Sequence, residues 1–189
     1  MSELPPKLSN PSCPLPLPHM DRIVMGHGSG GKMMHDLIAR LFLPPLDNPI
    51  LRAGDDSGVV EVTNGLRLAI STDAHVVAPL FFPGGDIGRL AVCGTVNDVA
   101  MMGAAPLYLT AGFILEEGLE VALLQKITTS MQSAATEAGV QMIAGDTKVV
   151  QKGNADGLYI TTSGIGVIPL GVEIGGANAR PGDVIILSG

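Results

Sequence analysis

The chain has 189 residues, of which 46% are hydrophobic and 15% are charged, and its net charge at pH 7 is −7. A chain of this length and composition buries one sizeable core, which excludes a disordered tail rich in charge and poor in aliphatic side chains. The excess of acidic residues leaves no basic face to neutralise a phosphate backbone, so we expect no nucleic-acid partner.

The first 20 residues contain six prolines and are predicted to form an extended N-terminal arm. They lack the apolar segment of a secretory signal. The longest apolar stretch, residues 90–115, is interrupted by two polar residues and a proline, so we expect no transmembrane segment and no membrane partner. With only two cysteines, Cys13 and Cys93, the chain has no disulfide framework, and we predict a reduced, cytoplasmic protein.

A glycine-rich stretch, GHGSGGK, covers residues 26–32 after a short predicted strand at residues 22–25. It nearly matches a P-loop, but Met33 occupies the position of the magnesium-binding Ser or Thr. We interpret the stretch as a mobile lid at the start of a helix, because backbone N–H groups at a helix N-terminus attract phosphate. The phosphate-binding residues of this lid are predicted to be Gly28, Gly30, Gly31 and Lys32.

Helices are predicted where apolar side chains recur three and four residues apart. The first helix is expected to end at Pro44 and Pro45. Asp86 is the predicted N-cap of the second helix, and Gly139 is the predicted C-cap of the third. The three helices span residues 31–42, 87–103 and 119–138.

Strands are predicted where apolar residues alternate or run between turn signals. Asn64 and Gly65 form a strong hairpin signal between the first two of these strands. The irregular order of strands and helices favours an α/β (α+β) fold, with a mixed sheet and helices packed on one face. The strands span residues 57–62, 66–77, 106–115, 140–145 and 157–168.

The last residues of the chain, ARPGDVIILSG, indicate a turn followed by a strand that has no partner nearby in sequence. We expect this strand to begin a second domain that is cut short. The predicted organisation is an arm at residues 1–20, a main domain at 21–175, and the start of the second domain at 176–189.

Acidic residues near predicted strand ends and inside an apolar helix are the most informative feature. Asp98 lies on the core-facing stripe of the second helix, where an unpaired carboxylate costs on the order of several kcal/mol. Asp73 and Asp146 come at the C-terminal ends of predicted strands, where α/β folds place ligands, and Asp55 and Asp56 lie in a loop. Each residue alone fits a turn or a cap. Together they predict a Mg²⁺–nucleotide site with these five aspartates as the metal ligands.

The order of the motifs GDD, STD, NDVA-MMGA and GDTK resembles the PurM-like superfamily of proteins related to aminoimidazole ribonucleotide synthetase. Longer stretches, among them HGSGGK, STDAHVV, GFILEEG and AGDTKVV, are similar to the HypE family of hydrogenase maturation proteins over residues 21–189. The resemblance implies an N-terminal PurM-like domain that binds ATP through aspartate-held Mg²⁺. It also implies a homodimer in which strands of two copies pair into a barrel.

The HypE resemblance implies ATP-dependent dehydration. In that family a carbamoyl group, delivered by the carbamoyltransferase HypF to a C-terminal cysteine, becomes a thiocyanate. Its cyano group then passes to the iron of [NiFe] hydrogenase on a HypC–HypD complex. ATP would make the amide oxygen a leaving group while a base removes the nitrogen protons.

The residues expected to carry this chemistry are Lys148 and Asp98, as catalytic residues, with Asn97 and Thr147 as further nucleotide contacts. The chain ends at Gly189 without the C-terminal cysteine tail of the family. As given, it is therefore not expected to complete the reaction.

Two other interpretations stay open. The chain could belong to another PurM-like ATP-dependent enzyme, such as thiamine-monophosphate kinase or selenophosphate synthetase, although the latter ordinarily has Cys or selenocysteine in the glycine loop. It could also be a non-catalytic scaffold that only dimerises and docks partners. His75 alternates with Asp73 along one strand and would face the same side, and a structural role for it is preferred.

Overall fold

The computed structural model describes residues 22–187, which fall into two compact units divided between Asp47 and Asn48. The two units are described separately. The predicted proline-rich arm and Cys13 lie outside the described residues.

The first unit is helical throughout its regular structure. It contains the 3₁₀ turn η1 (Met25–Gly28), α1 (Lys32–Leu37), the π-helical turn η2 (Ile38–Phe42) and α2 (Leu43–Leu46). The strand predicted at residues 22–25 is therefore wrong, since Met25 belongs to η1.

The two prolines do not end the first helix, which is a second correction. Pro44 and Pro45 fall in the first turn of α2. Proline is tolerated there, because the N–H groups of a first turn have no hydrogen-bond partner within the helix. The wide π-helical turn before them, in which Leu43 donates its N–H to the carbonyl of Ile38, brings the chain into that position.

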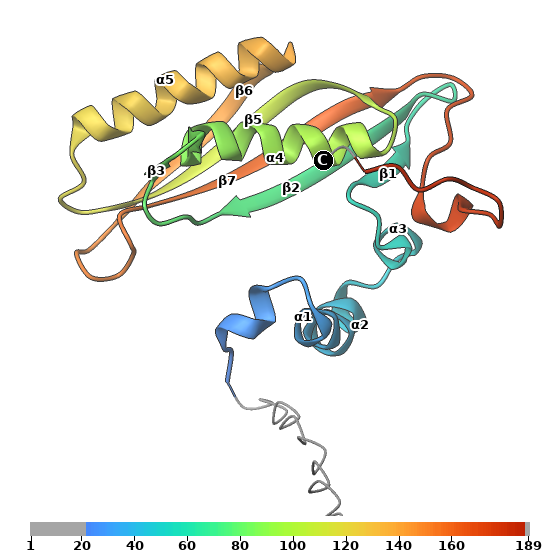
Figure 1. Ribbon diagram of the computed structural model, residues 1–189, viewed down its shortest axis with the longest axis horizontal. Coiled ribbons are helices and arrows are strands. Elements are labelled where there is room, and N and C mark those ends of the chain that lie inside the picture. The colour runs from blue at the N-terminus through green and yellow to red at the C-terminus, as the bar shows by residue number, and fades with distance from the viewer. Residues whose placement is uncertain (1–21, 188–189) are drawn as a thin grey trace, which may run out of the picture. The chain divides into compact units, whose positions relative to one another are not determined.

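The second unit is built on a mixed sheet of five strands in the order β1-β2-β7-β5-β6 (Figure 1). All neighbours are antiparallel except β5 and β6, which run parallel and are linked by the crossover helix α5. The predicted mixed sheet is thus confirmed. Its strands are β1 (Gly58–Glu61), β2 (Arg67–His75), β5 (Ala105–Glu116), β6 (Gln141–Val150) and β7 (Leu158–Ile168).

Short elements complete the second unit. They are α3 (Pro49–Ala53), the two-stranded ribbon of β3 (Phe81–Phe82) and β4 (Gly85–Asp86), and the 3₁₀ turn η3 (Gly176–Asn178).

The predicted hairpin connects β1 to β2. Asn64 has φ 58° and Gly65 has φ 76°, so both central residues of the turn are left-handed, as the Asn-Gly pair favours. The N–H of Val62 donates to the carbonyl of Leu66 and closes the loop at 2.8 Å.

The two long helices, α4 (Ile87–Met101) and α5 (Val121–Ala138), begin and end close to their predicted limits. Asp86 caps α4: its Oδ1 accepts hydrogen bonds from the N–H groups of Gly88 at 2.7 Å and Arg89 at 3.1 Å. Gly139 ends α5 in the left-handed conformation with φ 69°.

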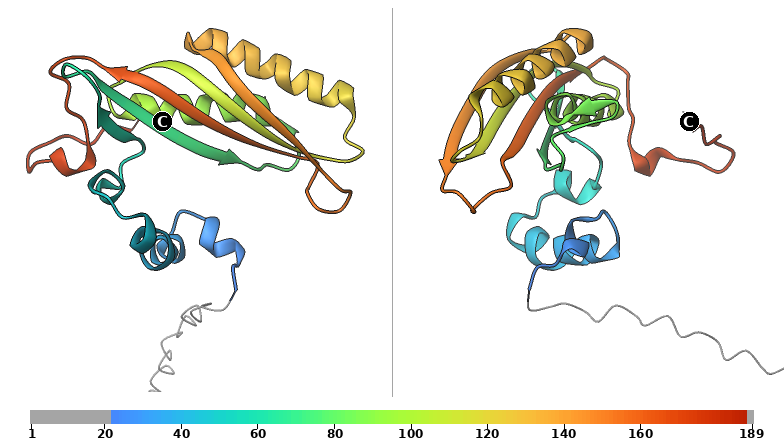
Figure 2. Two further views of the ribbon diagram at one scale, coloured as in Figure 1. Left: turned by 180° about the vertical axis from the view of Figure 1, so that it is seen from behind. Right: turned by 60° about the vertical axis from the view of Figure 1, so that its left-hand side comes forward.

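Both long helices cover the same face of the sheet, with α4 packed on β2 and β7 and α5 packed beside α4 (Figures 1 and 2). The predicted helix layer on one face is confirmed. Gly164 and Gly166 of β7 allow the close approach of α4, because a Cβ at Gly166 would lie 2.5 Å from the Val99 side chain. The main core between helices and sheet contains Ile87, Val92, Leu109, Ile127, Leu158 and Ile160, all at most 1% exposed.

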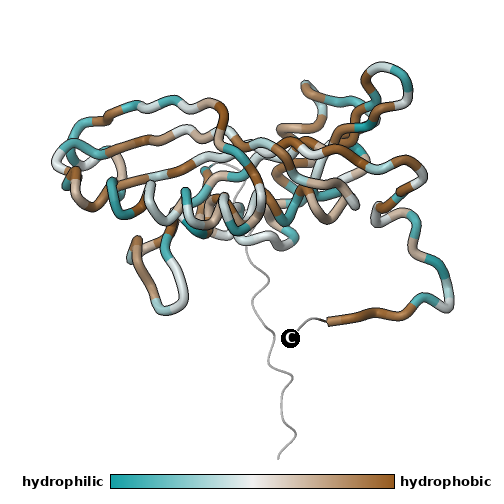
Figure 3. The backbone as a smooth tube through the Cα atoms, turned by 90° about the horizontal axis from the view of Figure 1, so that it is seen from above, coloured by the Kyte–Doolittle hydropathy of each residue, from teal (hydrophilic) through white to brown (hydrophobic). Residues whose placement is uncertain are grey.

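Two strand predictions need correction in their extent. β6 runs on to Val150, so Asp146 lies in the middle of a strand and does not end it. The strand expected after residue 183 is not formed, because residues 184–187 have no strand partner in the described part of the chain. Residues 184–187 are instead a hydrophobic run that is 82–90% exposed and forms the brown end of the tube in Figure 3.

Among residues 22–187, none of the helices combines the length and the hydrophobicity needed to cross a bilayer.

Candidate functional site

The α4–β2 contact brings two of the predicted acidic residues together. Asp98 projects from α4 and Asp73 from the helix-covered face of β2. The charge of Asp73 raises the pKa of Asp98, and both carboxylates act to raise the pKa of His75, so the three groups lie near one another. The hydroxyl of Ser71, two residues before Asp73 on the same face of β2, lies 2.9 Å from Oδ2 of Asp98. The same hydroxyl is 3.1 Å from the backbone carbonyl of Asp56.

The pKa of Asp98 is raised above its ordinary value, and burial is the largest cause. The hydrogen bond from Ser71 and the charge of His75 act in the opposite direction, whereas the charge of Asp73 raises the pKa further. A carboxylate pair of this kind favours either a proton or a cation between its members. Carboxylate oxygens are also the donors that Mg²⁺ prefers in proteins, so Asp73 and Asp98 fit that ion.

His75 ends β2 beside this pair and is 8% exposed. Its Nε2 lies 3.1 Å from the hydroxyl of Thr162 in β7, which is fully buried. The Thr162 hydroxyl lies 2.6 Å from the hydroxyl of Thr95 in α4 and donates to the backbone carbonyl of Ala91 at 2.9 Å. The preferred sequence interpretation, a satisfied structural histidine, agrees with these contacts.

Asp55 and Asp56 precede β1 and have different surroundings. Asp55 is half-buried, and its Oδ1 accepts a hydrogen bond of 3.0 Å from the N–H of Gly176. Asp56 is exposed, although the hydroxyl of its neighbour Ser57 donates to the backbone carbonyl of Asp98 at 2.8 Å. The GDD loop is therefore tied to α4 through its backbone and through Ser57.

Asp146 lies on the opposite face of the sheet from Asp73. The register pairs Asp73 with Thr162, Thr162 with Ala111, and Ala111 with Gly145, so these four residues share the helix-covered face. Asp146 follows Gly145 directly and points the other way, because successive side chains of a strand alternate.

Lys148 lies two residues after Asp146 on the same face of β6, and its Nζ is 3.2 Å from Oδ2 of Asp146. This ion pair lowers the pKa of Asp146, chiefly through its hydrogen bond. The side chains of Lys148 and Asp146 are 72% and 69% exposed, and Thr147 is exposed as well. Within this chain, Lys148 is therefore on the other side of the sheet from Asp98.

The glycine loop belongs to the first unit. A Cβ added at Gly28, Gly30 or Gly31 would meet no atom within 4 Å, and Gly30 has φ +76°, so the backbone of the loop is accessible. Lys32 is 88% exposed and pairs with Asp36 at 3.4 Å. In the second unit, Asn97 is exposed on α4 next to Asp98.

Residues 22–187 contain no group of three or more His, Cys, Asp or Glu side chains close enough together to hold a metal ion. The five predicted ligands thus divide into the Asp73–Asp98 pair, the Asp55–Asp56 loop and Asp146 on the opposite face.

Sequence reasoning missed the hydroxyl groups of this site, Ser71, Thr95 and Thr162. Ser71 has a recognisable signal, since it precedes Asp73 by two residues and so shares its face of the strand. Thr95 and Thr162 have none, because their contact joins residues 67 positions apart.

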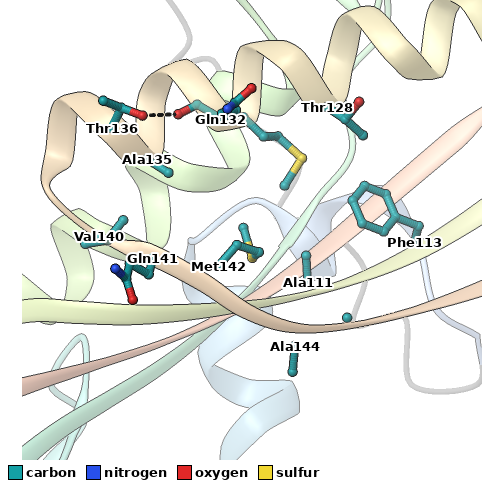
Figure 4. A pocket seen from close by; sticks show the side chains of 12 residues that line it. Ala111, Phe113, Thr128, Gln132, Ala135, Thr136, Val140, Gln141, Met142 and Ala144 are labelled. Carbon is teal, nitrogen blue, oxygen red and sulfur yellow. Dashed lines mark hydrogen bonds between the residues drawn. The ribbon is translucent and has the colours of Figure 1, made fainter.

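An apolar pocket of about 620 Å³ lies between α5 and the strands β5 and β6 (Figure 4). Phe113, Met131, Val140 and Met142 are among its lining side chains. None of the predicted site residues lines it.

Residues 54–168 of this chain match the N-terminal domain of the AIR synthase related protein family. The carbamoyl dehydratase HypE of Cupriavidus necator is 58% identical over 168 residues, which cover 89% of this chain and 48% of that protein. The chain spans about half the length of the curated relatives it matches.

Two solved structures are similar in fold and sequence. The first is a HypE–HypF complex, with a TM-score of 0.71 and 51% identity over 80% of this chain and 47% of that one. The second is the hydrogenase maturation protein HypE in complex with ATP, with a TM-score of 0.61 and 52% identity over 85% of this chain and 48% of that one. The resemblance drawn from the sequence motifs is confirmed.

Proposed function

This chain belongs to the AIR synthase related family through its N-terminal domain, and we propose that it is the Mg²⁺–ATP-binding part of a carbamoyl dehydratase of HypE type. The 58% identity to a protein of that name carries the proposal. A HypE relative that is 52% identical is known in complex with ATP, which supports the nucleotide.

Asp73 and Asp98 are the proposed inner part of the cation site. They are the two predicted ligands from different elements that approach each other in one chain, and burial is the largest cause of the raised pKa of Asp98. A divalent cation between them would offset both the repulsion and the desolvation. Asp55 and Asp56 would add oxygen donors from the adjoining loop, and Asn97 a contact to the nucleotide.

The glycine loop, with Gly28, Gly30, Gly31 and Lys32, is proposed to bind the ATP phosphates. Its accessible backbone and exposed lysine suit that role. When bound, ATP would convert the amide oxygen of the carbamoyl group into a leaving group. Lys148 remains the proposed partner for the γ-phosphate or for the proton that must leave the amide nitrogen.

The helix-free face of the sheet is the proposed interface of a homodimer. The helix-free face carries apolar side chains that are about 40% exposed, Ile70 at 40%, Tyr108 at 41% and Ile114 at 41%. Pairing of two such faces would bury these side chains and bring Asp146 and Lys148 of β6 next to a second copy, whereas Thr147 between them points to the helix-covered face. A barrel formed across this dimer remains part of the proposal. Small-angle scattering of the chain tests the dimer through the molecular mass.

The proposed partners and location follow the HypE relatives. HypF would deliver the carbamoyl group, as supported by a known HypE–HypF complex, and a HypC–HypD complex would receive the cyano group. The reaction would take place in the cytoplasm and would need the cysteine-bearing half of the protein. The organisation into an arm, a domain at 21–175 and a second domain from 176 is proposed on the same basis.

Titration calorimetry of this chain with ATP, in the presence and absence of Mg²⁺, tests the site. The parent chain should bind ATP more tightly with Mg²⁺, and Asp98→Asn should lose that difference. Asp156→Asn, an exposed acid in the loop between β6 and β7, is the matched control and should bind like the parent. Equal binding by the parent and Asp98→Asn would refute the site, and absence of any nucleotide binding would favour the scaffold interpretation.

A further inference from the structure

The buried hydroxyl of Thr162 contacts His75, Thr95 and the backbone carbonyl of Ala91, and these three contacts together bear on the tautomer of His75. Thr162 has a single hydroxyl proton, and its contact with the backbone carbonyl of Ala91 can only be a donation. The other two contacts of that oxygen, with Thr95 at 2.6 Å and with Nε2 of His75 at 3.1 Å, must then be accepted bonds. Nε2 of His75 therefore carries a proton.

The His75 ring and the Asp73 carboxylate both lie against α4 at Gly94. A Cβ added at Gly94 of α4 would lie 3.0 Å from Cε1 of His75, 3.9 Å from its Nδ1 and 3.2 Å from Oδ2 of Asp73. The Nδ1 edge and the Asp73 carboxylate thus lie against the same bare stretch of α4. An added methyl group at residue 94 would crowd both side chains, so the glycine eases the close approach of the helix to β2 here.

We propose that His75 is a positioning residue of the cation–nucleotide site, fixed by Thr162 as the Nε2–H tautomer so that its Nδ1 accepts a hydrogen bond beside Asp73 and Asp98. The second half of this inference rests on the proposed function. Mg²⁺ usually keeps several of its waters, and each water needs acceptors for its protons. Nδ1 is such an acceptor, so His75 would orient a water of the ion without touching the ion itself.

The tautomer is tested first, by nitrogen NMR of the chain labelled at histidine, with His75→Asn used to assign the signal. The parent and Thr162→Ser should both show the Nε2–H form, because the serine keeps the accepting oxygen. Thr162→Val should lose it. Thr95→Val is the matched control: it also replaces a fully buried threonine by valine, but it leaves the Thr162 oxygen in place and should keep the Nε2–H form.

The role at the site is tested by the affinity of the same variants for Mn²⁺–ATP, measured by water-proton relaxation. Thr162→Val should weaken binding about tenfold, equivalent to about 1.4 kcal/mol, while Thr162→Ser and Thr95→Val stay close to the parent. If Thr162→Val does not fold, the parent, Thr162→Ser and Thr95→Val still decide the tautomer.

The outcomes separate the inference from the proposed function. An Nδ1–H tautomer in the parent, or equal Mn²⁺–ATP affinity of Thr162→Val and the parent, overturns the inference. A parent chain that has the Nε2–H tautomer but binds no Mn²⁺–ATP overturns the proposed function, and with it the role at the ion, while the fixed ring orientation stands.

Discussion

Replacing Asp86 by alanine should be among the most damaging single changes to the second unit. This carboxylate is only 9% exposed and accepts three hydrogen bonds. Two come from the first N–H groups of α4, and the third comes from the hydroxyl of Ser130 in α5 at 2.6 Å. Asp86 therefore both begins α4 and joins it to α5.

The magnitude follows from these contacts. Loss of an N-cap side chain costs about 0.5–2 kcal/mol, and a hydrogen bond to a charged group contributes about 1.5–3 kcal/mol. Because the contacts share one carboxylate and do not add fully, we expect Asp86→Ala to lower the free energy of unfolding by about 3 kcal/mol. For a chain of this size, that corresponds to a decrease in Tm of about 6–12 °C.

The assay is thermal and urea unfolding followed by circular dichroism. Asp86→Asn is the matched control, since its amide oxygen still accepts from Gly88 and Arg89 and its NH₂ can donate to Ser130. It should lose about 1 kcal/mol, the difference between a charged and a neutral acceptor. A decrease in Tm for Asp86→Ala no larger than that of Asp86→Asn would refute the reasoning.

Five further predictions concern the site, the β1–β2 turn and strand β6. Because burial raises the folded-state pKa of Asp98, the chain should lose stability as the pH rises from about 3.9 through that raised pKa, and Asp98→Asn should abolish this decrease in urea unfolding. His75 has the opposite sign: its lowered pKa should make the chain lose stability as the pH falls below about 6.5, and His75→Asn should remove that loss. Gly94→Ala should gain about 1 kcal/mol of helix propensity but lose about 1–3 kcal/mol through overpacking against His75 and Asp73. Its Tm should therefore fall or stay level, and its affinity for Mg²⁺–ATP in calorimetry should drop. Tighter binding would contradict the placement of the His75 ring beside Gly94. Gly65→Ala should cost about 1 kcal/mol, because the alanine must adopt a left-handed conformation, whereas Lys148→Ala should leave Tm unchanged, since its ion pair is exposed.

The sequence predicted the elements whose signals are local. The Asn64–Gly65 turn, the Asp86 cap and the Gly139 cap each depend on a few neighbouring residues, and all three are confirmed. The errors arose where a longer-range effect decides. Proline normally ends a helix, but Pro44 follows a π-helical turn and lies in the first turn of the next helical segment, where proline is tolerated.

The candidate site was predictable in composition and less so in geometry. Asp73 and Asp98 could be expected to approach each other, because one lies on the core-facing stripe of a helix and the other on a strand beneath it. The face of Asp146 could not be read from its own segment, since it depends on where β6 begins and on its register with β5.

The topology of the sheet also determines the order in which this protein can assemble. β5, α5 and β6 are consecutive, so their contacts close short loops, and we expect this unit to form early in folding. β2 instead meets β7 across 90 positions of sequence, a contact that pays a larger loop-closure entropy. His75 reaches the Thr162 hydroxyl only when that contact closes. The orientation of His75 set by Thr162 would therefore be a late product of folding, and a nascent chain could not acquire it before β7 has been synthesised.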